Sequence, residues 1–272
     1  MIRIAILLLS VSFSLHAQTI ERVISLAPSA TELAYAAGLG DKLIAVSERS
    51  DYPEFAKDLE KVANYQGLNI ERIITLQPDL IVAWSSGNPS KDLAKLRQFG
   101  FTIYESNAAT LEDIAVNIEE LSQYADDPSY GEKNAREFRQ SLEQLKQKYH
   151  TEQSVSYFYQ LSEKPIITVA KGHWPSEVFS FCGGVNVFAN SAASYPQVGL
   201  EQVLLANPEV IFTSRHAIEN SKMWQPWHAQ LQALQNQHIW TLQSDWINRP
   251  TQRTLLAIEQ VCERFETVRQ KR

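Results

Sequence analysis

Residues 70–81 read Ile70-Glu-Arg-Ile-Ile-Thr-Leu-Gln-Pro-Asp-Leu-Ile81, and residues 200–211 read Leu200-Glu-Gln-Val-Leu-Leu-Ala-Asn-Pro-Glu-Val-Ile211. The two stretches align without a gap at an offset of 130 residues (200 minus 70), and apolar positions match apolar positions. Each is typical of a short helix, a turn at the proline and a buried strand. Two ordinary units of this kind could arise separately. Their places in opposite halves of the chain favour duplication, which predicts two related lobes.

Helical and strand patterns alternate on both sides of each repeat. Buried strands are expected at residues 22–26, 43–47, 80–84, 101–105, 155–161, 166–170, 209–213 and 238–242. Helices are expected between them, and one opens at Ser29-Ala-Thr-Glu32, a pattern typical of a capping box. Alternation of this kind predicts parallel sheets that are covered by helices.

A long charged helix at residues 131–149 breaks the alternation, with Ala135, Phe138, Leu142 and Leu145 on one apolar stripe. The fold class is therefore expected to be α/β, with two Rossmann-like lobes of parallel-rich sheets joined by a single long helix and a ligand cleft between the lobes. The expected divisions are a signal peptide at 1–17, an N-terminal lobe at 18–127, an interlobe helix at 128–150 and a C-terminal lobe at 151–272.

The first residues have the pattern of a cleaved signal peptide. A short basic start ending at Arg3 precedes an apolar run at residues 4–15, which is too short to span a bilayer. Ala17 then precedes the polar Gln18. A buried N-terminal strand is the alternative. The pattern predicts export to the periplasm, with cleavage near Ala17.

Composition and motifs exclude several classes of function. Removal of the signal peptide takes away Arg3, which leaves 24 basic and 31 acidic residues, a net charge of −7. So acidic a chain has no evident nucleic-acid footprint, and no later stretch is apolar enough for a membrane helix. The histidines are scattered without metal-ligand spacing, and no nucleophile elbow or phosphate-binding loop is present. We expect a protein that is not an enzyme and holds no metal of its own, although a triad assembled from distant residues stays an alternative.

The chain has two cysteines, Cys182 and Cys262, both in the exported part. In an oxidising compartment an isolated pair is expected to form a disulfide. A loop of about 80 residues would then be closed, which the chain-entropy account values at about 4 kcal/mol. A reactive thiol is the alternative, which the absence of a histidine near either cysteine in the sequence disfavours.

Glu71 and Glu201 occupy equivalent positions near the start of the two repeated helices. A carboxylate there is stabilised by the helix dipole, which is a sufficient structural reason for its presence. Alternatively, each lobe presents one acid to a partner built from two copies of one subunit with basic pockets. The residues by themselves do not decide between these interpretations.

Several segments resemble the cobalamin-binding branch of the helical-backbone periplasmic binding proteins. They lie at residues 22–33, 50–53, 65–72, 78–84 and 244–246, and Cys182 and Cys262 match the disulfide positions of that branch. The resemblance implies a monomer in the free state, with two rigid lobes that hold cobalamin between them and deliver it to an ABC importer. It also implies that Glu71 and Glu201 form salt bridges with arginines of the two membrane subunits.

Aromatic residues gather where ligands bind in open α/β sheets, beyond the carboxyl ends of the strands. Tyr52, Trp84 and Trp246 follow or end predicted strands, while Tyr65 and Tyr195 lie in loops within reach of the same crevice. Aromatic rings offer broad flat contacts with a polar tip, which suits a planar macrocycle such as a corrin. The structural alternative is core packing. Tyr65 and Tyr195 stand where the resembled family commonly has tryptophan.

A polar loop surrounds Trp246. Asp245 and Asn248 are candidates to bond amides on the ligand edge, with Ile247 and Arg249 in the same loop. The chain departs from the resembled family at Ile247 and Asn248. His173 and Trp174, in a loop of the second lobe, are further candidates. A haem- or ferric-siderophore-binding protein of the same fold is the main alternative function, and a two-lobed sensor or scaffold is another.

Overall fold

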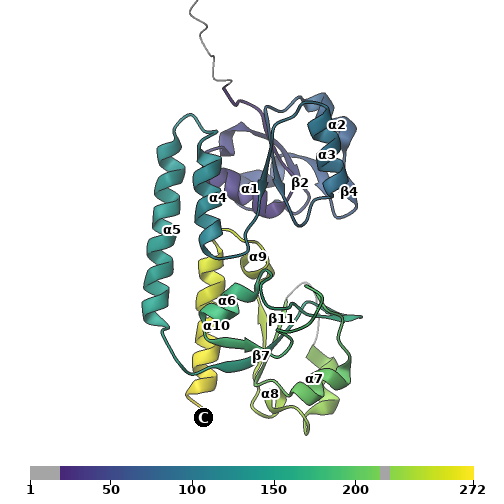
Figure 1. Ribbon diagram of the computed structural model, residues 1–272, viewed down its shortest axis with the longest axis vertical. Coiled ribbons are helices and arrows are strands. Elements are labelled where there is room, and N and C mark those ends of the chain that lie inside the picture. Colours follow the sequence, from purple (N-terminus) through teal and green to yellow (C-terminus); the bar gives the residue numbers. More distant parts are fainter. Residues whose placement is uncertain (1–18, 215–220) are drawn as a thin grey trace, which may run out of the picture.

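The computed structural model describes residues 19–214 and 221–272 (Figure 1). The predicted signal peptide at residues 1–17 lies outside the described residues. The described chain forms two α/β lobes, one above the other in Figure 1, with helix α5 alongside. This arrangement confirms the predicted fold class.

The first lobe is built on a sheet with strand order β4-β3-β2-β1-β5-β6, in which β4 alone among the described strands of this sheet runs antiparallel to its neighbour. Its strands are β1 (Val23–Ser25), β2 (Leu43–Ser47), β3 (Glu60–Asn64), β4 (Gly67–Leu68), β5 (Leu80–Trp84) and β6 (Ile103–Ser106). Helices cover both faces, which explains why β1 and the first four residues of β5 are buried throughout. The helices are α1 (Pro28–Ala36), α2 (Ile70–Leu76), α3 (Ser90–Gln98) and α4 (Glu112–Ser122). Core contacts place α1 and α4 on one face, and α2 and α3 on the other.

The second lobe has a parallel sheet with strand order β10-β7-β11-β12. Its strands are β7 (Val155–Gln160), β10 (Gly184–Asn186), β11 (Val210–Ser214) and β12 (Ile239–Leu242). One face packs against α6 (Ser176–Phe181) and α10 (Thr254–Arg269), and the other against α7 (Leu200–Ala206) and α8 (Gln232–Gln235). The predicted strand at 166–170 is wrong in extent, because Ile166–Ile167 (β9) pairs with Ser162–Glu163 (β8) in a separate hairpin. Sequence analysis also missed β3, β4 and β10, of which β4 and β10 are only two and three residues long.

Helix α5 (Pro128–Lys148) carries the chain from the first lobe to the second. Its 21 residues give it a length of about 32 Å, and it packs against α4 and α10, one from each lobe (Figure 1). Asp127 caps its start by accepting a hydrogen bond from the backbone N–H of Ser129. The division of the chain at residues 127 and 151 remains a prediction.

The repeated stretches fold alike. Helices α2 and α7 each have seven residues and end at a residue with left-handed backbone, Gln77 (φ 44°) and Asn207 (φ 40°). Strands β5 and β11 follow, and both are interior strands of their sheets. The offset of 130 residues is therefore preserved in the structure as well as in the sequence.

The capping box predicted at Ser29–Glu32 is wrong. Helix α1 starts with Pro28 at its first position, after Ala27, and no side chain caps it among the described residues. Proline suits the first helical position because the missing N–H would have no partner there. The Glu32 carboxylate is instead taken by arginines of the second lobe.

The predicted disulfide is confirmed. Cys182 and Cys262 are bonded, and both are fully buried. The bond ties the end of α6 to the middle of α10, and so fixes the two helices that cover one face of the second sheet. Across residues 19–214 and 221–272, no helix combines the length and apolar character needed to cross a membrane.

Candidate ligand-binding site

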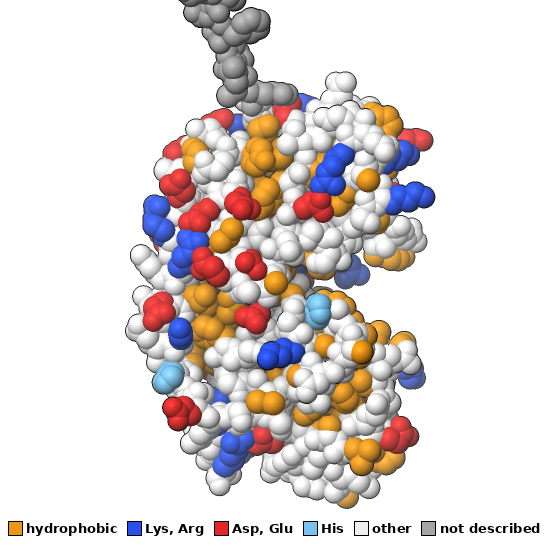
Figure 2. Space-filling view, viewed as in Figure 1, with side chains coloured by type: hydrophobic (Ala, Val, Ile, Leu, Met, Phe, Trp, Pro, Cys, Tyr) orange, Lys and Arg blue, Asp and Glu red, His pale blue; other side chains and the backbone are white. Residues whose placement is uncertain are grey.

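A cavity lies between the lobes at the carboxyl ends of the strands. Figure 2 shows the molecule hollowed there, on the side away from α5. The cavity holds about 540 Å³, within the roughly 300–1,000 Å³ of small-molecule sites. The first lobe contributes Trp84, Ser86, Asn107, Ala108 and Ala109, and the second contributes Leu161, Gly172, His173, Trp174, Pro175, Ser194, Tyr195, Asn248 and Pro250. Apolar and aromatic groups with a few amides and hydroxyls are typical of an organic ligand site.

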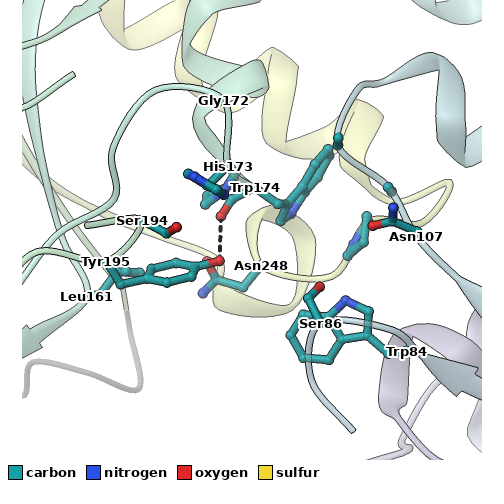
Figure 3. Close-up of a pocket in the computed structure, with 14 residues that line it drawn as sticks. Trp84, Ser86, Asn107, Leu161, Gly172, His173, Trp174, Ser194, Tyr195 and Asn248 are labelled. Atoms are coloured by element: carbon teal, nitrogen blue, oxygen red, sulfur yellow. Dashed lines mark hydrogen bonds between the residues drawn. The ribbon is translucent and has the colours of Figure 1, made fainter. Parts of the chain in front are cut away.

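Trp84 forms the aromatic part of the wall in the first lobe (Figure 3). It is the last residue of β5, and its backbone N–H donates to Asn88 Oδ1 at 2.7 Å. Asn88 in turn donates to the Leu26 carbonyl at 2.9 Å, so the turn is anchored to the end of β1. A Cβ atom on Gly87 would lie 1.9 Å from a carbon of the Trp84 ring. Glycine is therefore required there for the indole to keep its place.

The wall in the second lobe holds its aromatic rings through hydrogen bonds. Trp174 Nε1 donates to the Ile247 carbonyl at 2.8 Å, and the Tyr195 hydroxyl donates to the Trp174 carbonyl at 3.2 Å. Figure 3 shows the latter bond, with His173 beside it. Burial raises the pKa of Tyr195 above its ordinary value, so the hydroxyl stays protonated. Tyr159 donates to Asn248 Oδ1 at 3.0 Å, and within residues 19–214 and 221–272 no group accepts from the Asn248 amide, so its N–H groups can donate to a ligand.

Among the predicted contact residues, Trp84, Tyr195 and Asn248 line the cavity. So do His173 and Trp174. These five residues come from segments far apart in the sequence. Whether they touch a ligand remains a prediction.

The other predicted contact residues lie outside the cavity wall as the described residues define it. Tyr65 is 91% exposed at the turn between β3 and β4, and Tyr52 is half-exposed beneath the guanidinium of Arg253, 4.3 Å from its ring centre. Trp246 is partly buried and packs against the core. Ile247 is fully buried, because the one-turn helix α9 (Ser244–Ile247) directs it inward. The Ile247 side chain is therefore turned away from the cavity and is not among the proposed ligand contacts.

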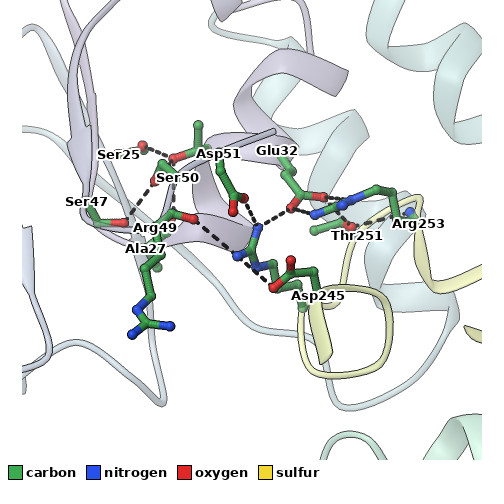
Figure 4. A network of polar contacts seen from close by, with 12 residues as sticks. Ser25, Ala27, Glu32, Ser47, Arg49, Ser50, Asp51, Asp245, Thr251 and Arg253 are labelled. Carbon is green, nitrogen blue, oxygen red and sulfur yellow. Dashed lines mark hydrogen bonds and ion pairs between the residues drawn. The ribbon is translucent and has the colours of Figure 1, made fainter. Parts of the chain in front are cut away.

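Asp245 and Arg249 belong to a charged cluster that joins the lobes (Figure 4). Arg249 contacts Asp245 Oδ1 at 2.8 Å, Asp51 Oδ1 at 2.8 Å and Glu32 Oε1 at 3.1 Å. Burial alone would raise the pKa of Asp51, but the hydrogen bond and charge of Arg249 outweigh it and lower that pKa. Sequence analysis missed Glu32, Asp51 and Arg253 in this role.

Ser86 and Asn107 are lining residues that sequence analysis missed although a signal was available. They lie just beyond the carboxyl ends of β5 and β6, which is the position that the rule for open sheets identifies. Leu161 directly follows β7 and offers the same signal, whereas Ser194 offers none, because it lies in an irregular segment of the second lobe.

Glu71 and Glu201 are both exposed in the first turns of α2 and α7. These helices lie in different lobes but on the same side of the molecule, away from α5 (Figure 1). A flat partner that spans both lobes on this side could contact both acids. Such docking remains a prediction.

Comparison with known proteins agrees with this architecture. Residues 23–246 match the family described as periplasmic binding protein. The vitamin B12-binding protein of Vibrio parahaemolyticus is 66% identical over 261 residues, covering 96% of this chain and 95% of that protein. The crystal structure of the periplasmic vitamin B12 binding protein BtuF of Vibrio cholerae matches with a TM-score of 0.89 and 62% identity, over 92% of this chain and 98% of that one. The heme-binding protein RhuT from Roseiflexus sp. RS-1 (TM-score 0.81, 21% identity, 92% and 99% coverage) is similar in fold alone. The chain belongs to the periplasmic binding protein family.

Proposed function

We propose that this protein binds vitamin B12 in the periplasm and delivers it to an ABC importer. It acts as a transport component and not as an enzyme. The observation that carries the proposal is the cavity between the lobes, in which Trp84 faces the second lobe's Trp174 and Tyr195. Aromatic groups on both walls suit a flat corrin, while Asn107 and Asn248 can pair with the amides at its edge. Relatives of near full length that carry the name of vitamin B12-binding protein support the same ligand.

Titration of the purified protein with cyanocobalamin tests the proposal. Saturable binding at one ligand per chain is expected. Tryptophan fluorescence and calorimetry both measure it. Haem and a ferric siderophore are titrated in parallel. If the protein binds haem or the ferric siderophore but not cyanocobalamin, the transport role would stand and the proposed ligand would be wrong.

Replacing Trp84 by alanine is expected to weaken cyanocobalamin binding by at least about 1 kcal/mol, because the Trp84 indole would no longer stack on the corrin ring of the ligand. Trp240→Ala is the matched control, since Trp240 is also partly buried but lies on β12 beneath Arg264, outside the cavity wall. Calorimetry on both variants gives the two affinities. Equal losses would show that Trp84 acts through folding. Trp246→Ala, measured alongside, decides whether Trp246 belongs to the contact set.

The proposed partner is the pair of membrane subunits of the importer, with one acid of each lobe paired to arginines. Three observations support this docking mode: the exposure of Glu71 and Glu201, their equivalent helical positions, and the common side on which α2 and α7 lie. Two identical subunits would then meet two equivalent helices, α2 in one lobe and α7 in the other.

A further inference from the structure

Glu32 lies on α1 in the first lobe, but its carboxylate is held by the second lobe. Oε2 accepts hydrogen bonds from Thr251 Oγ1 at 2.8 Å and from Arg253 Nε at 2.9 Å. Oε1 accepts from Arg249 Nη1 at 3.1 Å and is also paired with Arg253 Nη2. All these donors come from the segment between α9 and α10, more than 200 residues further along the chain.

This cluster is largely withdrawn from water. The Glu32 side chain is 4% exposed, and those of Arg249 and Arg253 are 12% and 16% exposed. Charge-assisted hydrogen bonds are strong where water is excluded. Removal of one charged group of the cluster would leave the opposite charges buried without a full set of partners. The cluster therefore favours one arrangement of the lobes over others.

The second-lobe side of the cluster is continuous with the cavity wall. Asn248 and Pro250, the neighbours of Arg249, both line the cavity. Arg249 Nη2 also donates to the Arg49 carbonyl at 3.1 Å, beyond the end of β2. Figure 4 shows Glu32, Asp51 and the Arg49 carbonyl approaching this segment from the first lobe. The loop that carries Asn248 is thus fixed to the first lobe.

A single long helix, α5, carries the chain from one lobe to the other. A helix attached at one side still permits rocking about that side, whereas a second attachment removes this freedom. Helix α5 lies along the outside of both lobes, and the Glu32 cluster lies between them (Figures 1 and 4). Together they make two separate points of connection.

We propose that Glu32 is a positioning residue that sets the distance between the two walls of the ligand cavity without lining that cavity itself. The inference rests on the proposed function, because the cavity must be the site of vitamin B12 binding. Loss of the Glu32 charge frees the lobes to sample arrangements in which the walls stand apart. Binding then has to select the closed arrangement from a mixture.

The test compares Glu32→Gln with the intact protein by cyanocobalamin calorimetry and by solution scattering. If the binding-competent arrangement falls to about one tenth of the population, the apparent Kd rises about tenfold. The scattering radius of the free variant should exceed that of the intact protein, and ligand should return it to the intact value. The intact protein should keep one radius with and without ligand.

Glu209→Gln is the matched control. The Glu209 side chain is 21% exposed, against 4% for Glu32, and its carboxylate accepts from Ser156 and pairs with Arg272, so its partners lie in its own lobe. The Glu209→Gln variant should change the free energy of unfolding without changing the scattering radius or the affinity for cyanocobalamin. If Glu32→Gln does not fold, Thr251→Val removes one bond to Glu32 and should give a smaller change in the same direction.

An unchanged affinity and radius in Glu32→Gln would overturn the inference, as would equal changes in Glu209→Gln. Failure of the proposed function has a different signature, because the intact protein would then not bind cyanocobalamin. In that case the radius of the free variants still decides whether Glu32 sets the arrangement of the lobes.

Discussion

Simultaneous replacement of Glu71 and Glu201 by alanine is expected to abolish vitamin B12 uptake by cells while leaving the affinity of the purified protein unchanged. The two acids lie on α2 and α7, outside the cavity wall, so neither can contact a ligand held there. Truncation of one partner in a buried, charge-paired interface typically costs about 2–5 kcal/mol, so two such losses add up to about 4–10 kcal/mol, which is comparable with the roughly 8 kcal/mol that holds a micromolar complex together. Each single replacement should give an intermediate defect, since one lobe would still dock.

Uptake of radiolabelled cyanocobalamin in a strain that lacks the endogenous binding protein provides the measurement. Glu137→Ala with Glu143→Ala is the matched control, because both glutamates are exposed on α5, the helix on the opposite side of the molecule. The control should transport normally. Loss of ligand affinity in parallel with uptake would contradict the docking role and assign the two acids to folding or to the site.

Removal of the disulfide is expected to lower the free energy of unfolding by about 4 kcal/mol. The bond closes a loop across a sequence separation of 80 residues, and opening it restores conformational freedom to the unfolded chain. Denaturant unfolding of the double variant Cys182→Ala with Cys262→Ala gives the difference. The folded variant should still bind cyanocobalamin, because neither cysteine lines the cavity.

The intact protein unfolded in the presence of a thiol reductant serves as a second measurement of the same quantity. The reduced protein keeps both sulfur atoms. Any further decrease in the free energy of unfolding of the double variant therefore measures the cost of the cavity that the missing sulfur atoms leave in the core. A loss below about 1 kcal/mol in both experiments would mean that the unfolded chain is already compact around this pair.

Local patterns in the sequence predicted most of the fold. The repeats at 70–81 and 200–211 predicted helix, turn and strand in both lobes, because apolar spacing and proline report on the nearest neighbours of a residue. Errors occurred where tertiary contacts override such patterns. Ser29 and Glu32 have the spacing of a capping box, yet Pro28 starts the helix and Glu32 is drawn to the other lobe.

The candidate site divides in the same way. Trp84 could be predicted from its position at a strand end, and Asn107 should have been predicted by the same rule. Ile247 could not be separated from Asn248 in advance, because the two are adjacent and only the direction of a one-turn helix makes one buried and the other a lining residue.

The sequence by itself determined the alternation of strands and helices, the two related lobes, the long connecting helix and the pairing of the cysteines. Each of these features depends on residue type, on the spacing of apolar residues over a few helical turns, or, for the cysteines, on each having one possible partner. The tertiary structure decided which aromatic rings line the cavity and that Glu32 meets Arg249, 217 residues away. Such contacts depend on how the sheets of the two lobes are oriented, and no local periodicity encodes that orientation.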